Sequence, residues 1–360
     1  MTATTLTRRR LAVIFGGRST EHEVSVVSAR GVMREADPDR FEVIPVGITK
    51  GGAWLTPEET RSRLARVEAG ERRDIGDERG GGVFAYPRVM ETLREVDVVF
   101  PIVHGTFGED GTLQGLLEMA DLPYVGPGVA ASAAGMDKAL MRAVFAAHDI
   151  PQARYLVLRD DEARAPGAET FREIERAIGY PCFVKPANGG SSVGVGKARS
   201  REDAGTAIAE AARYDRKVLV EEALSGQEVE CAVLGNRDPQ PSPLGEIRPS
   251  TEFYDYQAKY LDDSAALIVP AEVDEATAAR VRDLAVRAFR ALDCAGLSRV
   301  DFFVQPDGSV KCIEVNTLPG FTPISMYPRL WQEAGVSYRD LITRLVDLAF
   351  ERFEEARRHA

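Results

Sequence analysis

A pair of acidic side chains near the C-terminal end gives the sequence its clearest chemical pattern. RVDFFV (299–304) and VKCIEVN (310–316) have the composition of two strands joined through Pro-Asp-Gly-Ser. If residues 306–309 form a four-residue loop, Asp301 lies directly opposite Glu314 in this hairpin. Two carboxylates that face each other across a ladder repel and destabilise the sheet. A divalent cation between them would remove that repulsion, so the pattern predicts a metal site.

Two further polar side chains belong to the same face of this predicted hairpin. Because strand side chains alternate, Arg299 shares a face with Asp301, and Asn316 shares one with Glu314. The oxygens of Asp301, Glu314 and Asn316, without any His or Cys, favour Mg²⁺ or Mn²⁺. The alternative is an ordinary solvated hairpin face. The interleaved apolar residues favour a core strand pair over that alternative; they are Phe302, Val304, Ile313 and Val315.

A second candidate site is the glycine- and serine-rich stretch KPANGGSSVGVGK, residues 185–197. It fails the Walker A pattern because Ser191 stands where the first glycine is needed and Ala198 follows the lysine. It fails the dinucleotide fingerprint because the last glycine position holds Arg199. Short apolar strands flank the loop, so we expect a hairpin tip whose N–H groups and hydroxyls cover phosphates as a lid. An ordinary mobile turn is the alternative.

Composition limits the classes of protein to consider. With 360 residues, 44% hydrophobic and 28% charged, the chain predicts two or three globular domains. The net charge of -11 argues against a nucleic-acid partner. No apolar run approaches the length of a membrane span, so we expect no membrane partner and a cytoplasmic location. Widely spaced cysteines favour reduced, buried thiols over disulfides; they are Cys182, Cys231, Cys294 and Cys312.

The N-terminal third predicts a parallel α/β sheet, because strands alternate with helices. We expect strands at 11–15, 41–48 and 96–105, and a helix from Thr112 to Ala120. Thr20 and Glu23 have the spacing of a capping box, which would open a helix ending near Met33. Residues 56–82 are charged and glycine-rich, which indicates a surface helix and loops.

Beyond a break near Gly135, the pattern changes to shorter helices and paired strands. Residues 138–224 predict a helix, the strand pair around the glycine-rich loop, a helix at 200–213 that begins with a capping box at Ser200, and the strand KVLVEEAL. Residues 225–360 predict longer strands, a helix at 274–291, the acidic hairpin and a final amphipathic helix at about 338–357.

A metal-binding hairpin, a glycine–serine lid and lysines at 138, 185 and 259 are together typical of an ATP site of one kind. The sequence resembles the ATP-grasp superfamily and, within it, the D-alanine:D-alanine ligase family nearly from end to end. The motifs that carry the resemblance are GGRSTEHEVS (16–25), HGTFGEDGTLQG (104–115), MDK (136–138), KPANGGSSVGVGK (185–197), EEALSGQEVE (221–230), YDYQAKY (254–260), RVDFF (299–303) and EVNTLPGFTPISM (314–326).

The resemblance implies an ATP-grasp fold of mixed α/β and α+β class in three domains. These would be an N-terminal α/β domain (1–137), a central domain with the lid (138–224) and a C-terminal domain with the metal hairpin (225–360). The last two would sandwich the nucleotide. It also implies a homodimer that converts two D-alanines and ATP to D-alanyl-D-alanine, ADP and phosphate through D-alanyl phosphate, for peptidoglycan synthesis.

The resemblance assigns roles at the nucleotide end of the site. Lys138, Lys185 and Lys259 would contact ATP, and Asp301, Glu314 and Asn316 would bind two Mg²⁺ or Mn²⁺ ions. The loop with Gly190, Ser191 and Ser192 would close over the phosphates. Glu228 would bind the ribose, while Glu221 and the backbone near Glu222 and Leu224 would recognise adenine.

It also assigns roles at the amino-acid end. Glu23 would hold the ammonium of the first D-alanine, and Ser325, the Met326 backbone and Lys259 would hold the carboxylate of the second. Arg299 and the Gly320 N–H would stabilise the oxyanion, and a chain of Tyr260, Ser191 and Glu23 would latch the lid and carry a proton. His104, at the end of a predicted parallel strand, is assigned to the substrate site.

Several alternatives remain open from the sequence. Glu23 could serve its capping box, and His104 could be a structural histidine. A D-alanine:D-lactate or D-alanine:D-serine ligase would share the fold, although Tyr260 within YDYQAKY favours an amine acceptor. A non-catalytic nucleotide- or amino-acid-binding protein and another ATP-grasp carboxylate–amine ligase are more distant candidates.

Overall fold

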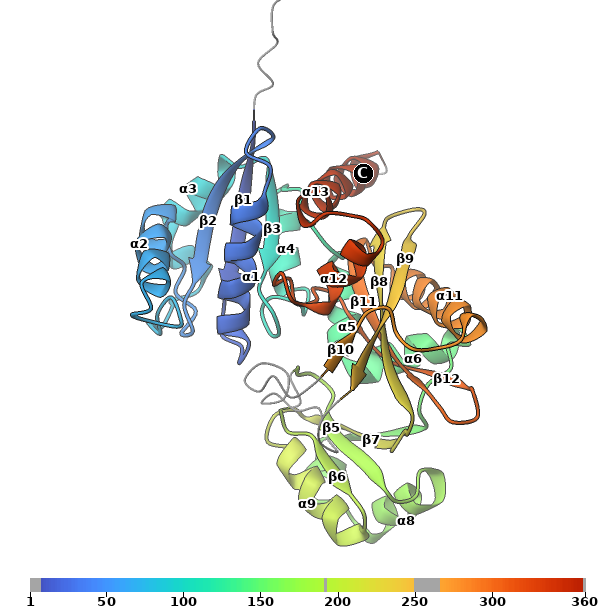
Figure 1. The fold of residues 1–360 in the computed structure, drawn as a ribbon. Coiled ribbons are helices and arrows are strands. Elements are labelled where there is room, and N and C mark those ends of the chain that lie inside the picture. The colour runs from blue at the N-terminus through green and yellow to red at the C-terminus, as the bar shows by residue number, and fades with distance from the viewer. Residues whose placement is uncertain (1–7, 191–192, 249–265, 359–360) are drawn as a thin grey trace, which may run out of the picture.

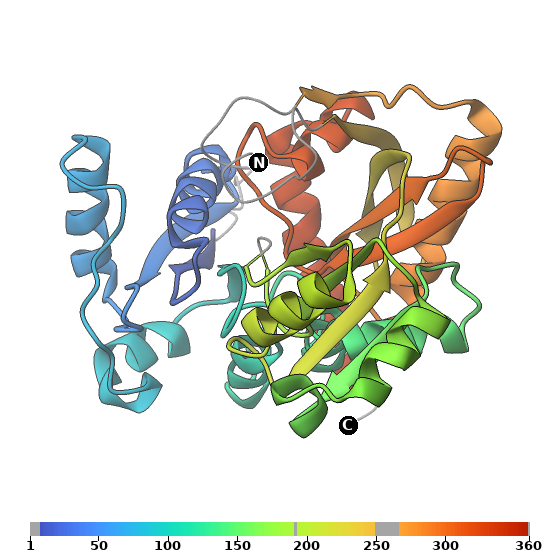
Figure 2. The ribbon, with the colours of Figure 1, turned by 90° about the horizontal axis from the view of Figure 1, so that it is seen from below.

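The computed structural model describes residues 8–190, 193–248 and 266–358, which form three β-sheets with helices around them (Figure 1). Seen from below, the N-terminal unit lies on the left, the C-terminal unit on the right, and the middle unit in front of both (Figure 2). Among the described residues, none of the helices combines the length and apolar character needed to cross a bilayer.

The N-terminal sheet is parallel, with strand order β2-β1-β3. The predicted strands at 11–15 and 41–48 are confirmed, and the apolar run from 96 supplies the third. The elements of this unit are β1 (Arg9–Gly16), α1 (His22–Glu35), β2 (Phe41–Ile48), α2 (Pro57–Glu68), α3 (Pro87–Arg94), β3 (Val98–Ile102) and α4 (Thr112–Met119).

The predicted capping box at the start of α1 is wrong. The helix begins at His22, its N-cap is Glu21, and no side chain caps it by a hydrogen bond. Glu23 is therefore the second residue of the helix, and its carboxylate pairs with Lys50 instead of with the backbone. The reciprocal capping box in this unit occurs at α2, between Thr56 and Glu59, in the region expected to hold a surface helix.

The middle sheet is antiparallel, with order β4-β7-β5-β6. The glycine-rich loop joins β5 to β6 as a hairpin, which confirms the strand–loop–strand order. Ser200 caps α9 by accepting the N–H of Asp203, but the Asp203 carboxylate accepts the N–H of Arg199, so the box is not reciprocal. The elements are β4 (Tyr155–Arg159), α7 (Asp161–Arg164), α8 (Ala168–Ala177), β5 (Cys182–Pro186), β6 (Gly196–Ala198), α9 (Arg201–Ala211) and β7 (Lys217–Glu222).

The C-terminal sheet has order β10-β9-β8-β11-β12, with α11 packed on one side. Its elements are β8 (Gln227–Gly235), β9 (Gln240–Arg248), β10 (Ala266–Ile268), α11 (Glu275–Ala291), β11 (Gly296–Val304), β12 (Val310–Asn316), α12 (Met326–Glu333) and α13 (Tyr338–Arg357). Two earlier helices, α5 (Val129–Met136) and α6 (Lys138–Ala147), contribute to the same core as this sheet.

The acidic hairpin has the predicted residue pairing around Asp301 and Glu314, and a different register nearer its turn. Asp301 pairs with Glu314 and Arg299 with Asn316, as expected. Nearer the turn the register shifts, so that Phe302 pairs with Cys312 and the ladder ends at Val304 and Val310. A bulge in the second strand therefore compensates for a loop one residue longer than the predicted four.

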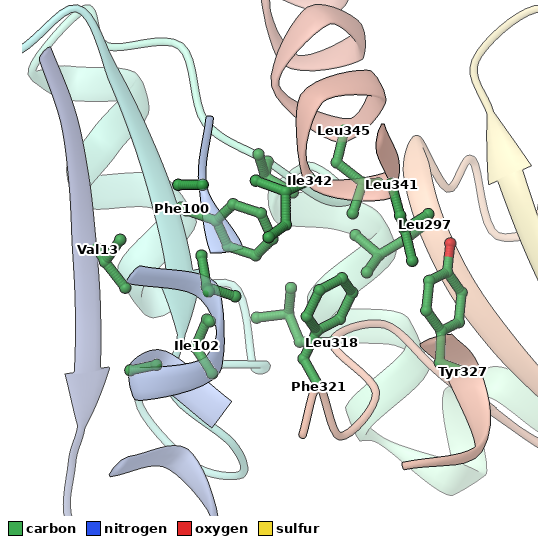
Figure 3. Packing of buried hydrophobic residues seen from close by; sticks show 14 of the residues in the cluster. Val13, Phe100, Ile102, Leu297, Leu318, Phe321, Tyr327, Leu341, Ile342 and Leu345 are labelled. Atoms are coloured by element: carbon green, nitrogen blue, oxygen red, sulfur yellow. The ribbon is translucent and has the colours of Figure 1, made fainter. Parts of the chain in front are cut away.

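The N-terminal and C-terminal units share one hydrophobic core (Figure 3). Phe100 of β3 meets Phe321 edge-on, with ring centroids 5.6 Å apart, and Phe321 also contacts the ring of Tyr338 at the start of α13. Leu341, Ile342 and Leu345 of α13 pack into the same cluster (Figure 3). This shared core fixes the 316–326 loop against the N-terminal sheet. The four cysteines are free and buried, as expected.

Candidate active site

A cavity of about 810 Å³ is lined by residues from all three units. Many of the residues assigned from the sequence line it together, although they come from distant parts of the chain. They are Glu23, His104, Lys138, Lys185, Gly190, Arg299, Glu314, Asn316, Gly320, Ser325 and Met326. The volume falls in the range of pockets that bind small molecules.

Arg299 lies at the centre of a buried charge network on the face of β8, β11 and β12. Its Nε and Nη2 donate to the two oxygens of Asp301 at 2.8 and 2.7 Å, and Nε lies 3.2 Å from an oxygen of Glu230. Asn316 Nδ2 donates to Asp301 Oδ2 at 2.9 Å. Burial opposes the charge of Arg299, but Asp301 and Glu230 overcome it and raise the pKa of the guanidinium well above its usual value.

The oxygens of this donor set suit a hard divalent cation, although both oxygens of Asp301 accept from Arg299 and Asp301 itself does not line the cavity. Asp301 faces Glu314 across the ladder, and the amide nitrogen of Asn316 is engaged by Asp301, which leaves its amide oxygen as the ligating group. Within the described part of the chain, no group of three or more His, Cys, Asp or Glu side chains could hold a metal ion. Two carboxylates and one amide would need further oxygen ligands, and Mg²⁺ commonly takes these from substrate phosphates.

Two lysines face the cavity near the glycine-rich loop. Lys185 Nζ forms an ion pair with Glu221, whose other oxygen accepts from Arg142 Nη2 at 2.9 Å. Lys138 Nζ donates to the carbonyl of Gly189 at 2.7 Å. Burial, together with nearby Lys185, lowers the pKa of Lys138, while Glu314 acts in the opposite direction. Both ammonium groups therefore lie beside the loop that was predicted to cover phosphates.

The four residues assigned to adenine and ribose do not line this cavity. Glu221 is held between Arg142 and Lys185. Glu222 accepts from Arg154 Nε at 2.6 Å and from the Arg154 N–H at 2.9 Å. Leu224 follows β7, and Glu228 stands on β8 opposite Phe303. The two ion pairs of Glu221 show that its carboxylate positions Lys185 and Arg142. The nucleotide roles of all four residues stay predictions.

The end of the cavity that the sequence assigned to amino acids is formed by residues of α1, His104 after β3 and the 316–326 loop. His104 Nδ1 donates to the Leu318 carbonyl at 3.0 Å, which leaves Nε2 as the buried acceptor of a ring that lines the cavity. Burial lowers the pKa of His104 and favours this neutral form. A Cβ added to Gly320 would lie 3.2 Å from Ser325 Oγ, so the backbone approaches that hydroxyl closely.

Four residues at the site were missed by the sequence reasoning. Glu109 accepts from the N–H groups of Gly105 and Leu318 at 2.5 and 3.2 Å, and burial followed by the charge of Glu21 raises its pKa to about 8. Glu109 stands inside the quoted motif HGTFGEDGTLQG, and Glu230 faces Asp301 in the register of β8 and β11. Glu21, which lines the cavity, stands inside the quoted motif GGRSTEHEVS. Lys50, which pairs with Glu23, had no sequence signal beyond its residue type.

Ser191, Ser192, Lys259 and Tyr260 lie outside the described residues. The proposed chain from Tyr260 through Ser191 to Glu23 therefore stays a prediction, of which the structure describes only the Glu23 end. Gly189 and Gly190, which precede Ser191, do line the cavity.

The fold is that of an ATP-grasp ligase. It combines an antiparallel sheet that carries a glycine-rich loop, a second sheet that carries a carboxylate pair, and a parallel α/β unit. Sequence profiles match over most of the chain. Residues 10–127 match the profile for the D-Ala D-Ala ligase N-terminus, and residues 144–347 match the profile for the C-terminus. The chain belongs to the D-alanine–D-alanine ligase family.

Individual relatives agree with this placement. The D-alanine–D-alanine ligases of Geobacillus thermodenitrificans and Halothermothrix orenii are 48% and 47% identical to the chain; coverage of this chain is 97% and 96%, and coverage of the relatives is 97% and 99%. The solved D-alanine-D-alanine ligase from Coxiella burnetii superposes with a TM-score of 0.81 at 33% identity, covering 98% of this chain and 96% of that one. The VanG D-Ala:D-Ser ligase from Enterococcus faecalis gives 0.80 at 34% identity, with coverage of 95% and 100%.

Proposed function

We propose that this chain joins two D-alanines into D-alanyl-D-alanine while ATP is converted to ADP and phosphate, as a step of peptidoglycan synthesis. The observation that carries the proposal is the single cavity, which combines two lysines, a glycine-rich loop and metal-type oxygen ligands at one end with an acidic helix start at the other. Similarity to ligases that are named for this reaction supports the substrate.

At the nucleotide end, the ammonium groups of Lys138 and Lys185 neutralise phosphate charge, and the loop from Gly189 closes over it. Asp301, Glu314 and Asn316 would hold two Mg²⁺ or Mn²⁺ ions per site. When bound, these ions polarise phosphoryl oxygens and offset their charge. In this proposal Glu228 binds the ribose, Glu221 and the backbone near Glu222 and Leu224 recognise adenine, and Lys259, Ser191 and Ser192 complete the phosphate contacts.

Joining a carboxylate to an amine is uphill in water, so the carboxylate must first become a better electrophile. A carboxylate oxygen of the first D-alanine attacks the γ-phosphorus, the bond to ADP breaks, and D-alanyl phosphate forms. The amine of the second D-alanine then attacks the acyl carbon, and phosphate leaves with that oxygen. The protein contributes positioning, charge neutralisation and exclusion of water.

At the amino-acid end, Glu23 holds the ammonium of the first D-alanine, and His104 belongs to the same substrate site; both residues line the cavity. Ser325, the Met326 N–H and Lys259 bind the carboxylate of the second. Arg299 and the Gly320 N–H meet the oxyanion of the tetrahedral adduct. The chain of Tyr260, Ser191 and Glu23 latches the lid and takes the proton that the second ammonium must lose.

We further propose that the chain acts as a cytoplasmic homodimer with units at 1–137, 138–224 and 225–360. The three sheets support this division. Helix α6 is the first helix of the second unit, but its residues Met141 and Phe145 pack in the hydrophobic core of the third unit.

A coupled assay of phosphate release across D- and L-amino acids tests the proposal. We expect release that needs both D-alanine and a divalent cation, with dipeptide as the product. Release without an amino acid, or with L-alanine as effective as D-alanine, would contradict it.

The similarity to VanG makes D-serine, and by extension D-lactate, the acceptors to compare. Assays at about pH 6 and about pH 9 separate them, because an amine acceptor gains nucleophilicity as it loses its proton. Dipeptide formation should dominate, and ester formation that dominates at the lower pH would assign the chain to D-lactate.

A further inference from the structure

The loop between α2 and α3 folds back over the end of β2, beside the start of α1 (Figure 1). We call residues 72–76 the strap. The Lys50 N–H donates to the carbonyl of Gly76 at 2.8 Å, and Arg63 Nη1 donates to the carbonyl of Ile75 at 2.9 Å. Backbone and side-chain contacts thus hold the strap at a defined place on the N-terminal unit.

Ile75 and His22 lock the strap to the first turn of α1. Ile75 is buried in the core shared by the N- and C-terminal units, and its N–H donates to His22 Nε2 at 3.4 Å. His22 is fully buried, and its Nδ1 donates to the Gly17 carbonyl at 2.8 Å. Burial lowers the pKa of His22, which agrees with this neutral ring. Because His22 directly precedes Glu23, the strap and the acidic helix start are positioned together.

Lys50 lies between the carboxylates of α1 and the strap. Its Nζ forms an ion pair with Glu23 Oε1 and lies 3.5 Å from Asp74 Oδ2. Asp74 is itself fixed, because it accepts from Arg72 Nη2 at 2.8 Å and from the Gly76 N–H at 3.0 Å. Glu23 lines the cavity, whereas Lys50 and Asp74 do not. Lys50 therefore reaches Glu23 from behind.

We propose that Lys50, anchored by Asp74, is a positioning residue that holds one oxygen of Glu23 and presents the other to the ammonium of the first amino acid. This inference rests on the proposed function, because it assumes that Glu23 binds that ammonium. The Glu23 side chain is 35% exposed, so without a partner it would sample several rotamers and lose free energy when it became ordered around a ligand. A prefixed carboxylate avoids that loss.

The opposite role for Lys50 is a competitor, since its ammonium is the same chemical group as that of the substrate. The geometry argues against competition: Lys50 does not line the cavity, and its backbone and ammonium are both held by the strap. The two roles predict opposite changes. Loss of a positioning residue weakens binding of the first amino acid, whereas loss of a competitor strengthens it.

The test compares Lys50→Met, Lys50→Arg, Asp74→Asn and the double variant Lys50→Met/Asp74→Asn with the wild-type chain. For Lys50→Met we expect the KM of the first D-alanine to rise about fivefold with kcat changed less than about twofold, as suits a partly exposed ion pair that acts on binding. Asp74→Asn should raise the same KM about threefold. The double variant should match Lys50→Met, because Asp74 acts through Lys50. Lys50→Arg keeps the charge and should restore most of the affinity.

The matched control is Arg66→Met, which removes an exposed ion pair of α2 with Glu71, next to the strap. Rates measured against D-alanine at saturating ATP resolve the KM values of the two amino-acid sites. A lower first-site KM in Lys50→Met would overturn the proposal in favour of competition. Equal changes in the KM of ATP and of both amino-acid sites would overturn it in favour of a general structural role. If the wild-type chain and Arg66→Met both release no phosphate with D-alanine, the proposed function itself fails, and the positioning role fails with it.

Discussion

Glu221 provides the most quantitative test of the nucleotide end, because its carboxylate holds two buried cations. The side chains of Arg142, Glu221 and Lys185 are 2%, 10% and 11% exposed. In Glu221→Gln, one carbonyl oxygen remains to accept a hydrogen bond, but the amide nitrogen faces a cation and the negative charge is lost. Removing one partner of a buried ion pair lowers the free energy of unfolding by about 3–5 kcal/mol. Because the glutamine oxygen still accepts one hydrogen bond, we expect a loss of about 3 kcal/mol, at the lower end of this range.

Urea-induced unfolding of the middle unit, followed by circular dichroism, measures that cost. With a slope of about 3 kcal/mol per molar urea, a loss of about 3 kcal/mol lowers the midpoint by about 1 M. Glu169→Gln in α8 is the control, since its ion pair with Arg172 is exposed, and its midpoint should move by less than about 0.2 M. A Glu221→Gln midpoint within that margin of the wild type would refute the role of Glu221 as the anchor of Lys185.

The same variant has a defined pH dependence. Burial alone would raise the pKa of Glu221, but Lys185 and Arg142 overcome it and lower the pKa below the usual value. A carboxyl whose pKa is lower in the folded state stabilises the fold above its unfolded pKa of about 4.3, and this contribution is lost as the pH falls toward the folded pKa. The difference between wild type and Glu221→Gln should therefore be largest near neutral pH and shrink below about pH 4.

Three other substitutions test the remaining parts of the site. Asp301→Asn should reduce turnover by at least about a thousandfold, measured where the variant is folded, and a near-normal rate would remove the metal assignment. Because the substitution also breaks the buried ion pair with Arg299, it should lower the unfolding midpoint by an amount similar to that of Glu221→Gln. Tyr260→Phe should admit D-lactate as acceptor or weaken closure of the lid, and an unchanged acceptor preference would show that the residue does not select. Glu109 has a folded-state pKa of about 8, above its unfolded value, so wild-type stability should fall relative to Glu109→Gln as the pH rises from about 5 to 8; parallel unfolding curves across that range would contradict the shift.

The sequence predicts this fold well where a clear pattern of apolar residues covers a whole strand or helix. The buried strand Phe41–Ile48 has the predicted bounds, and the order of strand, glycine-rich loop and strand was predicted because no helix signal follows the loop directly. The pairing of Asp301 with Glu314 was predicted from an assumed four-residue loop at 306–309. The longer turn and its bulge cancel at that pair, so the pairing was right although the predicted loop length was wrong.

The parts that sequence could not supply depend on contacts between distant segments. The Thr20 and Glu23 spacing fits a capping box, but Lys50 takes the Glu23 carboxylate in the fold, and a tertiary ion pair leaves no local pattern. The strap likewise has weak periodicity because Ile75 alone enters the core. Glu109 sits in a loop whose burial comes from the 316–326 segment far along the chain. Such residues are recognised only once the units are assembled.

The central claim is that one cavity passes a phosphoryl group from ATP to a carboxylate and then passes the acyl group to an amine. Oxygen-18 placed in the carboxylate of D-alanine tests it most directly, because the attacking oxygen must leave with the phosphate. Mass spectrometry of the released phosphate should find one labelled oxygen per dipeptide formed. Dipeptide formed with entirely unlabelled phosphate would show that the carboxylate is never phosphorylated and would contradict the account.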